Sequence, residues 1–229
     1  MTLTNQEVKL SPSKLSYEAR RCDRCFGLEL IGEKWPSSPF PGLFSALDRQ
    51  QRAYFEEQST QAFDQSLPSG TIHDGGRVKS APYTVDGIDF VISGSMDALI
   101  RFDDGTVGVV DYKSSSTKGL GEAYRPQLAA YGWALSHPAK GDPEQVSLYG
   151  LVALAPTEMT DTEKGRSYLV STTWYPYDIE DRWMEDLFKR LAPIVKNPHN
   201  AQSKEGCEWC DLRVRLTNQA EKTVKEGKR

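Results

Sequence analysis

The segment GSMDALIRFDDGTVGVVDYKSSS, residues 94–116, contains the pattern that decides the fold. Apolar residues on both sides of Asp103-Asp104-Gly105 predict two strands joined by a tight turn. Asp111 and Lys113 are two residues apart on the second strand. Because side chains alternate between the two faces of a strand, both project from the same face.

The type of turn decides where Asp97, on the first strand, points. If residues 103–105 form a three-residue loop with Gly105 in the left-handed conformation, Asp97 lies directly opposite Asp111. A two-residue loop would shift the register by one and turn Asp97 to the other face. Two facing carboxylates destabilise a sheet unless something binds them, and a divalent cation with hard oxygen ligands can do so. The segment therefore predicts a Mg²⁺ or Mn²⁺ site beside Lys113.

Such a site has a defined chemistry. A divalent ion bound by Asp97 and Asp111 would lower the pKa of a water nucleophile and offset negative charge that builds on a phosphate. Lys113 would orient or deprotonate that water, or stabilise the developing charge, and the sequence leaves these roles open. The D-x-K spacing alone is common by chance, so further motifs have to support it.

The rest of the chain predicts a mixed α/β domain with a central mixed β-sheet flanked by helices. We expect helices over residues 11–32, 42–63, 122–135 and 179–195, and further strands over 80–92, 146–155 and 168–175. Pro126 is expected in the first turn of its helix. Residues 1–10 are expected to be a flexible N-terminus, 11–215 a single domain, and 216–229 a charged tail.

Composition restricts the class of protein. The chain has 229 residues and a formal net charge of −4, so its whole surface is not the basic field of many DNA-binding proteins. Positive charge need only line a groove, however. No run of apolar residues is long enough for a signal peptide or a membrane span, so we expect a cytoplasmic protein with no membrane contact.

A second motif identifies a family. Gln127-Leu-Ala-Ala-Tyr131 follows the Asp97, Asp111 and Lys113 pattern, and positions four apart share one face of a helix. This ordered set resembles the RecB-like branch of the PD-(D/E)XK nucleases. The resemblance implies a restriction-endonuclease-like core that hydrolyses phosphodiester bonds in DNA, as an exonuclease. It also implies the following roles: Asp97, Asp111 and the main-chain carbonyl of Tyr112 bind the metal, and Gln127 and Tyr131 contact DNA or support Lys113.

The resemblance covers about residues 10–210, and it includes the N-terminal pattern SPSKLSYEARRCDRCFGLEL. One departure concerns the metal. RecB-like enzymes usually carry a histidine ligand on the helix before the strands, whereas this chain offers Asp48 there. Asp48 is the candidate for the replaced ligand, or is only a helix cap. His73 is the other candidate, although it lies among glycines in an expected loop.

Two C-x-x-C pairs, one near each end of the chain, predict a further metal site. Cys22, Cys25, Cys207 and Cys210 would close into a four-thiolate site for Zn²⁺ or a 4Fe-4S cluster that fastens the termini, or are free thiols. Related nucleases typically supply one cysteine from the N-terminal end and three from the C-terminal end. Here the division is two and two.

The functional expectation has rivals. As a nuclease, the protein would act on DNA, with a helicase or another recombination, repair or CRISPR protein as partner. A catalytically weak or inactive nuclease-like module that binds DNA or acts as a scaffold is favoured by the missing histidine and the acidic charge. A small structural protein clamped by its cysteines is the third reading.

Overall fold

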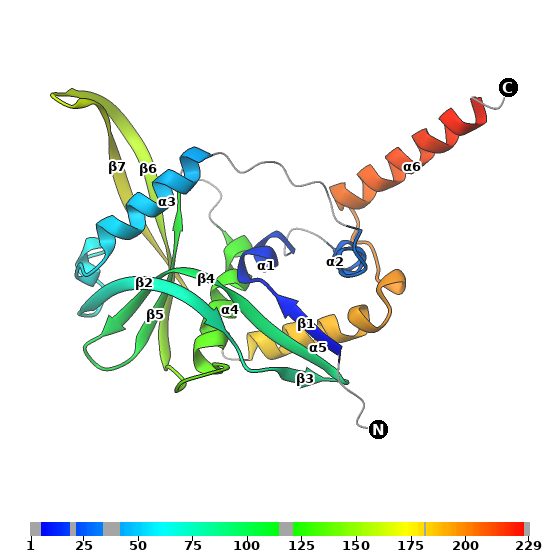
Figure 1. Ribbon diagram of the computed structural model, residues 1–229, viewed down its shortest axis with the longest axis horizontal. Coiled ribbons are helices and arrows are strands. Elements are labelled where there is room, and N and C mark those ends of the chain that lie inside the picture. The colour runs from blue at the N-terminus through cyan, green and yellow to red at the C-terminus, as the bar shows by residue number, and fades with distance from the viewer. Residues whose placement is uncertain (1–5, 19–21, 34–41, 115–120, 181, 227–229) are drawn as a thin grey trace.

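The computed structural model describes residues 6–18, 22–33, 42–114, 121–180 and 182–226 (Figure 1). In this part of the chain, seven strands form one mixed sheet in the order β1-β4-β5-β6-β7, with β2 and β3 also paired to β4. The strands are β1 Gln6–Leu10, β2 Gly70–Lys79, β3 Tyr83–Val85, β4 Ile88–Phe102, β5 Val107–Lys113, β6 Val146–Thr162 and β7 Gly165–Tyr177. Two pairings, β1 with β4 and β5 with β6, are parallel, and the others are antiparallel.

The helices are α1 Pro12–Glu18, α2 Asp23–Leu30, α3 Gly42–Phe55, α4 Arg125–Ser136, α5 Trp183–Lys196 and α6 Glu208–Glu226, with 3-10 turns at Thr60–Ala62, Glu122–Tyr124 and Pro198–Asn200. Both faces of the sheet are covered. Leu128 of α4 packs on the face that carries Val109, whereas Phe55 of α3 packs on the face that carries Val110. β5 is therefore buried along nearly its whole length, as expected for a strand between two helical layers. The expectation of a mixed sheet flanked by helices is confirmed.

The predicted hairpin has the predicted register. Ala98 pairs with Val110 and Leu99 with Val109 across β4 and β5, which places Asp97 one step further along, level with Asp111. Residues 103–105 form the three-residue loop, in which Gly105 has a φ of 87°. The shorter loop, which would have turned Asp97 to the other face, is thereby excluded.

We expect Gly105→Ala to destabilise the protein by about 1–2 kcal/mol, because a side chain at positive φ clashes with its own backbone. Nothing surrounds a Cβ added at Gly105, so the cost is conformational. Chemical denaturation measures the change in unfolding free energy. Gly121→Ala is the matched control, since Gly121 has an ordinary φ of −124° and equally open surroundings. Equal stability of the two variants would contradict the prediction.

Three expectations for the first 80 residues are corrected. Residues 6–10, expected to be flexible, form β1, which pairs in parallel with β4 and buries Val8 and Leu10 in the core. The single helix expected over 11–32 is divided into α1 and α2, and residues 19–21 between them lie outside the described residues. β2 was not expected, because its sequence GTIHDGGRVK is rich in glycine and polar residues. It forms because β4 is long enough to pair with it from Gly70 to Lys79.

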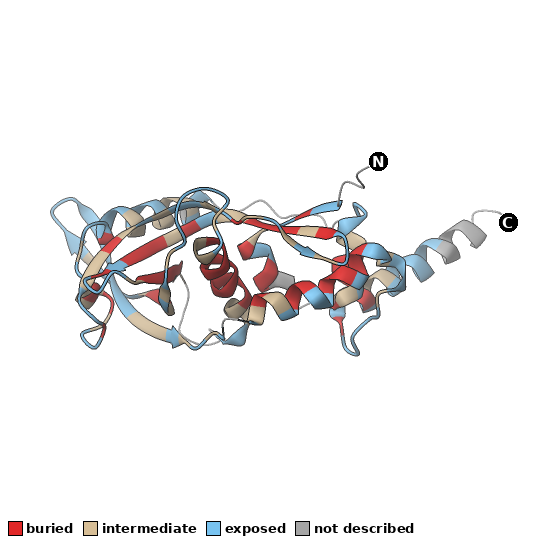
Figure 2. Ribbon diagram, turned by 90° about the horizontal axis from the view of Figure 1, so that it is seen from below, coloured by how far each residue is buried: buried red, intermediate tan, exposed pale blue. Residues whose placement is uncertain are grey.

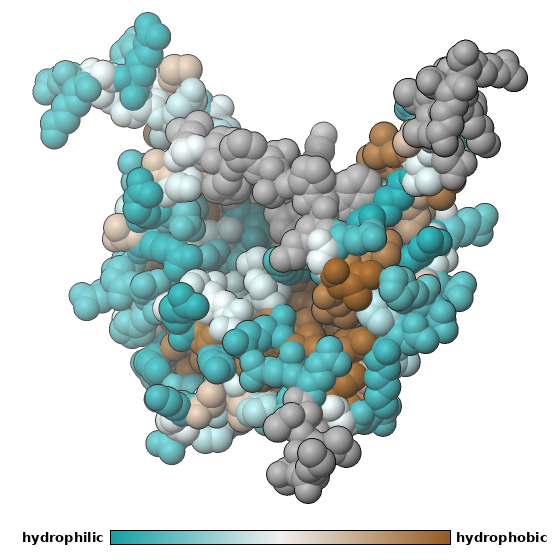
Figure 3. Space-filling view, turned by 45° about the vertical axis from the view of Figure 1, so that its right-hand side comes forward, coloured by the Kyte–Doolittle hydropathy of each residue, from teal (hydrophilic) through white to brown (hydrophobic). Residues whose placement is uncertain are grey.

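Elements further along the chain also differ from expectation. The segment expected to be a charged tail continues α6 as far as Glu226, and this helix projects from the body with mainly exposed residues (Figures 1 and 2). The helix expected over 42–63 ends at Phe55, and that over 179–195 begins at Trp183. β6 and β7 run past the sheet as a hairpin whose end is covered mainly by hydrophilic side chains (Figure 3). Among the described residues, no helix has the length and apolarity needed to span a membrane.

Candidate active site and cysteine site

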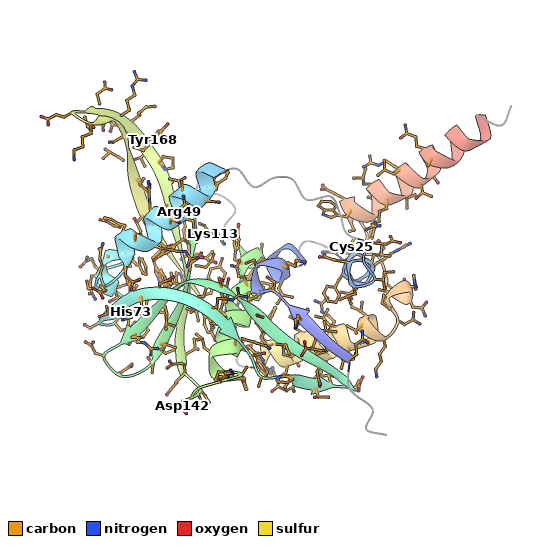
Figure 4. All side chains as sticks on the ribbon, in the orientation of Figure 1. Cys25, Arg49, His73, Lys113, Asp142 and Tyr168 are labelled. Carbon is orange, nitrogen blue, oxygen red and sulfur yellow. The ribbon has the colours of Figure 1, made fainter. Side chains whose placement is uncertain are left out.

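One cavity of about 610 Å³ is lined by nearly all the residues predicted for the catalytic and divalent-metal site. The predicted residues that line this cavity are Asp48, Asp97, Asp111, Tyr112, Lys113, Gln127 and Tyr131. Figure 4 labels Lys113 on β5 and Arg49 on α3, which line the same cavity. A somewhat larger hollow of about 730 Å³ is lined, among the described residues, by α6, and contains none of these residues.

Asp111 is the buried anion of the cavity, with 1% of its surface exposed. Its Oδ1 accepts a hydrogen bond from Gln127 Nε2 at 2.5 Å. Its Oδ2 forms an ion pair with Lys113 Nζ but has no hydrogen-bond partner among the described residues. Burial disfavours the charged form of Lys113, but the Asp111 carboxylate outweighs burial and raises the pKa of Lys113. Lys113 is thus held as an ammonium group beside a buried carboxylate oxygen.

Asp97 faces this pair from β4. Its Oδ2 accepts the main-chain N–H of Tyr112 at 2.9 Å, and its Oδ1 forms an ion pair with Arg52 Nη2. Burial and the nearby charge of Asp111 raise the pKa of Asp97 to about 8. A carboxylate whose ionisation is disfavoured by a neighbouring carboxylate is in the electrostatic situation that a divalent cation relieves.

Gln127 and Tyr131 lie on one face of α4, turned toward the sheet and almost fully buried. Gln127 links Asp111 to Ser16 of α1, whose hydroxyl donates to Gln127 Oε1 at 3.3 Å. The Tyr131 hydroxyl donates to the main-chain oxygen of Ser95 at 2.5 Å, and burial raises the pKa of Tyr131. In this arrangement the two side chains hold Asp111 and β4 in place.

The two candidates for the replaced histidine are placed differently. Asp48 lines the cavity, and since α3 begins at Gly42, the reading of Asp48 as a helix cap is wrong. His73 lies on β2 and not in a loop, and it is absent from the cavity lining. Its Nδ1 is 3.8 Å from Glu56 Oε1. The expectation of a loop failed because the glycines around His73 belong to a strand that β4 pairs.

Sequence reasoning missed Arg52. It lies one turn after Asp48 on α3, and its Nε donates to Asp48 Oδ2 at 3.3 Å. The i, i+4 spacing of an aspartate and an arginine on a helix was the available signal. Nothing in the sequence connected either residue with Asp97, which is far away along the chain.

The carboxylates suit a hard divalent ion. Among the described residues, Asp48, Asp97 and Asp111 do not all bring an oxygen within 4.8 Å of one another. Asp97 and Asp111 do present carboxylates from adjoining strands, and the Oδ2 of Asp111 is a buried acceptor beside the Lys113 ammonium. Mg²⁺ commonly takes one or two protein carboxylates and completes its shell with water and phosphate oxygens. Two carboxylates are therefore a sufficient protein donor set.

The four cysteines meet at the junction of α2 and α6. Cys22 and Cys25 approach Cys207 and Cys210, with Sγ–Sγ distances of 3.4 Å for Cys22 and Cys210, 3.8 Å for Cys25 and Cys207, and 3.5 Å for Cys25 and Cys210. All four are buried, none is in a disulfide, and their sulfurs lie within 4.8 Å of one another. The expectation that a four-cysteine site joins the terminal segments is confirmed.

A mixed sheet between helices, with two carboxylates and a lysine brought to one cavity by adjoining strands, defines the class of restriction-endonuclease-like proteins. The chain matches the family described as the PD-(D/E)XK nuclease superfamily over residues 8–215, and it belongs to that superfamily.

Comparison with solved structures finds similar chains at low identity. The crystal structure of SSO0001 has a TM-score of 0.46 and 21% identity over 84% of this chain and 77% of that one. An alkaline exonuclease from Laribacter hongkongensis, LHK-Exo, has a TM-score of 0.37 and 13% identity over 95% and 94%. LHK-Exo in complex with dAMP has a TM-score of 0.35 and 10% identity over 92% and 97%. Comparison with curated proteins finds no match.

Proposed function

We propose that the chain is a metal-dependent DNA nuclease that hydrolyses phosphodiester bonds, acting as an exonuclease as its resemblance to RecB-like enzymes suggests. The observation that carries the proposal is the meeting of Asp97, Asp111 and Lys113 at one cavity in a member of a nuclease superfamily. Asp97, Asp111 and the main-chain carbonyl of Tyr112 would hold Mg²⁺ or Mn²⁺.

The side chains have distinct roles in this proposal. A bound divalent ion would supply a water of lowered pKa and a Lewis acid for the phosphate. Asp111 is oriented by Gln127 and Asp97 by the main-chain N–H of Tyr112, so each carboxylate keeps a fixed direction toward the cavity. The Lys113 ammonium, paired with Asp111, would stabilise negative charge that develops on the phosphate oxygens.

Cleavage of end-labelled linear DNA tests the proposal. With Mn²⁺ we expect the parent protein to shorten single- or double-stranded DNA and Asp111→Asn to lose that activity, because the amide removes the buried charge. Asp142→Asn makes the same change in an exposed loop and is expected to cut like the parent. Cutting by Asp111→Asn at the parent rate would exclude this site, and the pattern of labelled products would reveal the polarity.

A second candidate is a nuclease-like module that binds DNA without cutting it. The observation that favours it concerns Asp48, which stands where related enzymes have histidine. Asp48 pairs with Arg52 and does not complete a group of three ligands with Asp97 and Asp111. Retention of DNA by folded parent protein in Mn²⁺, with no cleavage, would support this reading.

For the cysteines we propose one Zn²⁺ and not a 4Fe-4S cluster. Zinc–sulfur bonds of about 2.3 Å in a tetrahedral arrangement place the sulfurs about 3.8 Å apart. The distances of 3.8 Å between Cys25 and Cys207, 3.4 Å between Cys22 and Cys210 and 3.5 Å between Cys25 and Cys210 support a single ion. In a four-iron cluster each cysteine binds a different iron, and the irons keep the four sulfurs farther apart.

A further inference from the structure

Arg52 is the centre of a polar cluster between α3, β2 and β4 that no motif of the family resemblance includes. Its Nη1 donates to the main-chain oxygens of Met96 at 2.8 Å and Asp97 at 3.1 Å, and to Asp74 Oδ1 at 3.0 Å. Its Nη2 pairs with Asp97 Oδ1 and its Nε with Asp48 Oδ2. The planar guanidinium is thus held on several sides at once, which gives it a defined position.

The backbone of β4 explains why this contact matters. Asp97 pairs with neither neighbouring strand: the register with β5 ends at Ala98, and that with β2 passes from Ala98 to Met96. At this step the register of β4 is broken on both sides, so a contact from another element helps to fix the backbone there. Arg52 supplies donors to the carbonyls of Met96 and Asp97 at this point.

Arg52 also approaches the carboxylate from outside the cavity. Asp97 lines the cavity, whereas Arg52 does not. Asp74 of β2, which also pairs with Arg52, has a side chain that is 59% exposed and is likewise absent from the cavity lining. The direction of Asp97 is thus set by Arg52 on Oδ1 and by the Tyr112 N–H on Oδ2.

We propose that Arg52 is a positioning residue for the metal site, which holds the backbone and carboxylate of Asp97 in the geometry that the divalent ion requires. The inference rests on the proposed function, since it takes Asp97 as a metal ligand. Groups that orient metal ligands from behind typically contribute a factor of about 10–100 to metal affinity.

Mn²⁺ binding, measured by isothermal titration calorimetry of protein stripped of active-site metal, tests this without relying on activity. An alkaline pH reduces competition by protons for the carboxylates. Arg52→Gln is expected to raise the dissociation constant for Mn²⁺ by about 10–100-fold. Arg101→Gln is the matched control, because it removes the same charge and a comparable ion pair, with Glu144, from β4 outside the cavity lining and is expected to leave binding unchanged.

Two milder variants test the same role with less risk that the protein fails to fold. Arg52→Lys keeps the charge and is expected to restore part of the affinity. Asp74→Asn removes the ion pair between Arg52 and the exposed Asp74, so that Arg52 is held less firmly. This variant is expected to weaken Mn²⁺ binding about two- to fivefold. Circular dichroism and thermal unfolding without metal establish that each variant is folded.

The outcomes separate the inference from the function. Mn²⁺ binding by Arg52→Gln that is as tight as in the parent, or tighter, overturns the positioning role, and tighter binding would make Arg52 a competitor of the metal. Binding by the parent that Asp111→Asn abolishes keeps the proposed site intact in that case. A parent protein that binds no Mn²⁺ overturns both the inference and the metal-dependent function.

Discussion

Lys113→Ala is expected to lower the rate of DNA cleavage by about 10²–10⁴-fold while leaving Mn²⁺ binding largely intact. The ammonium group of Lys113 is the cation that β5 places beside Asp111, and its loss removes stabilisation of charge that develops only in the transition state. The carboxylates of Asp97 and Asp111 remain to hold the metal. Single-turnover cleavage with saturating Mn²⁺, together with calorimetric Mn²⁺ titration, measures the two effects separately.

The stability of this variant has to be measured too, because removing Lys113 leaves the buried Asp111 without its counter-charge in the metal-free protein. Lys140→Ala, on an exposed loop, is the matched control and is expected to cut like the parent. Cleavage by folded Lys113→Ala at the parent rate would remove Lys113 from the reaction. Loss of Mn²⁺ binding together with cleavage would give it a role in binding the metal.

Cys25→Ser is expected to lose the bound zinc and to release the clamp between α2 and α6. The parent protein should contain about one zinc ion per chain by elemental analysis, and the variant should contain almost none. Binding of zinc by four thiolates contributes directly to folding, so we expect a lower thermal midpoint and rapid proteolysis within α6. The remaining direct contacts of this junction include a main-chain hydrogen bond from Arg24 to Gln202 and an ion pair of the half-buried Arg213 with the exposed Glu33, which contributes little.

Glu208→Gln provides the control for the cysteine prediction, since this exposed residue of α6 lies between Cys207 and Cys210 and keeps all four thiolates. It is expected to retain zinc and the parent's thermal midpoint. Visible absorbance and stoichiometric iron in anaerobically purified parent protein would contradict the zinc assignment. Cys25→Ser with unchanged stability and no metal in the parent would show that the cysteines are free thiols.

Local patterns in the sequence determined the hairpin and the direction of its charged residues. The turn Asp103-Asp104-Gly105 sets the register because a glycine can take the left-handed position that a three-residue loop requires. Strand alternation then puts Asp111 and Lys113 on one face, and the four-residue spacing puts Gln127 and Tyr131 on one side of a helix. Each of these relations depends only on residues near one another in the chain.

Tertiary structure alone decided the relations that join distant segments. β2 is a strand because β4 offers it a partner, although its own sequence argues for a loop. Arg52 reaches Asp97 because α3 lies against β4, and the cysteines meet because α2 and α6 come together. A long-range contact depends on how whole elements pack, and neither residue of such a pair carries a local signal of the other.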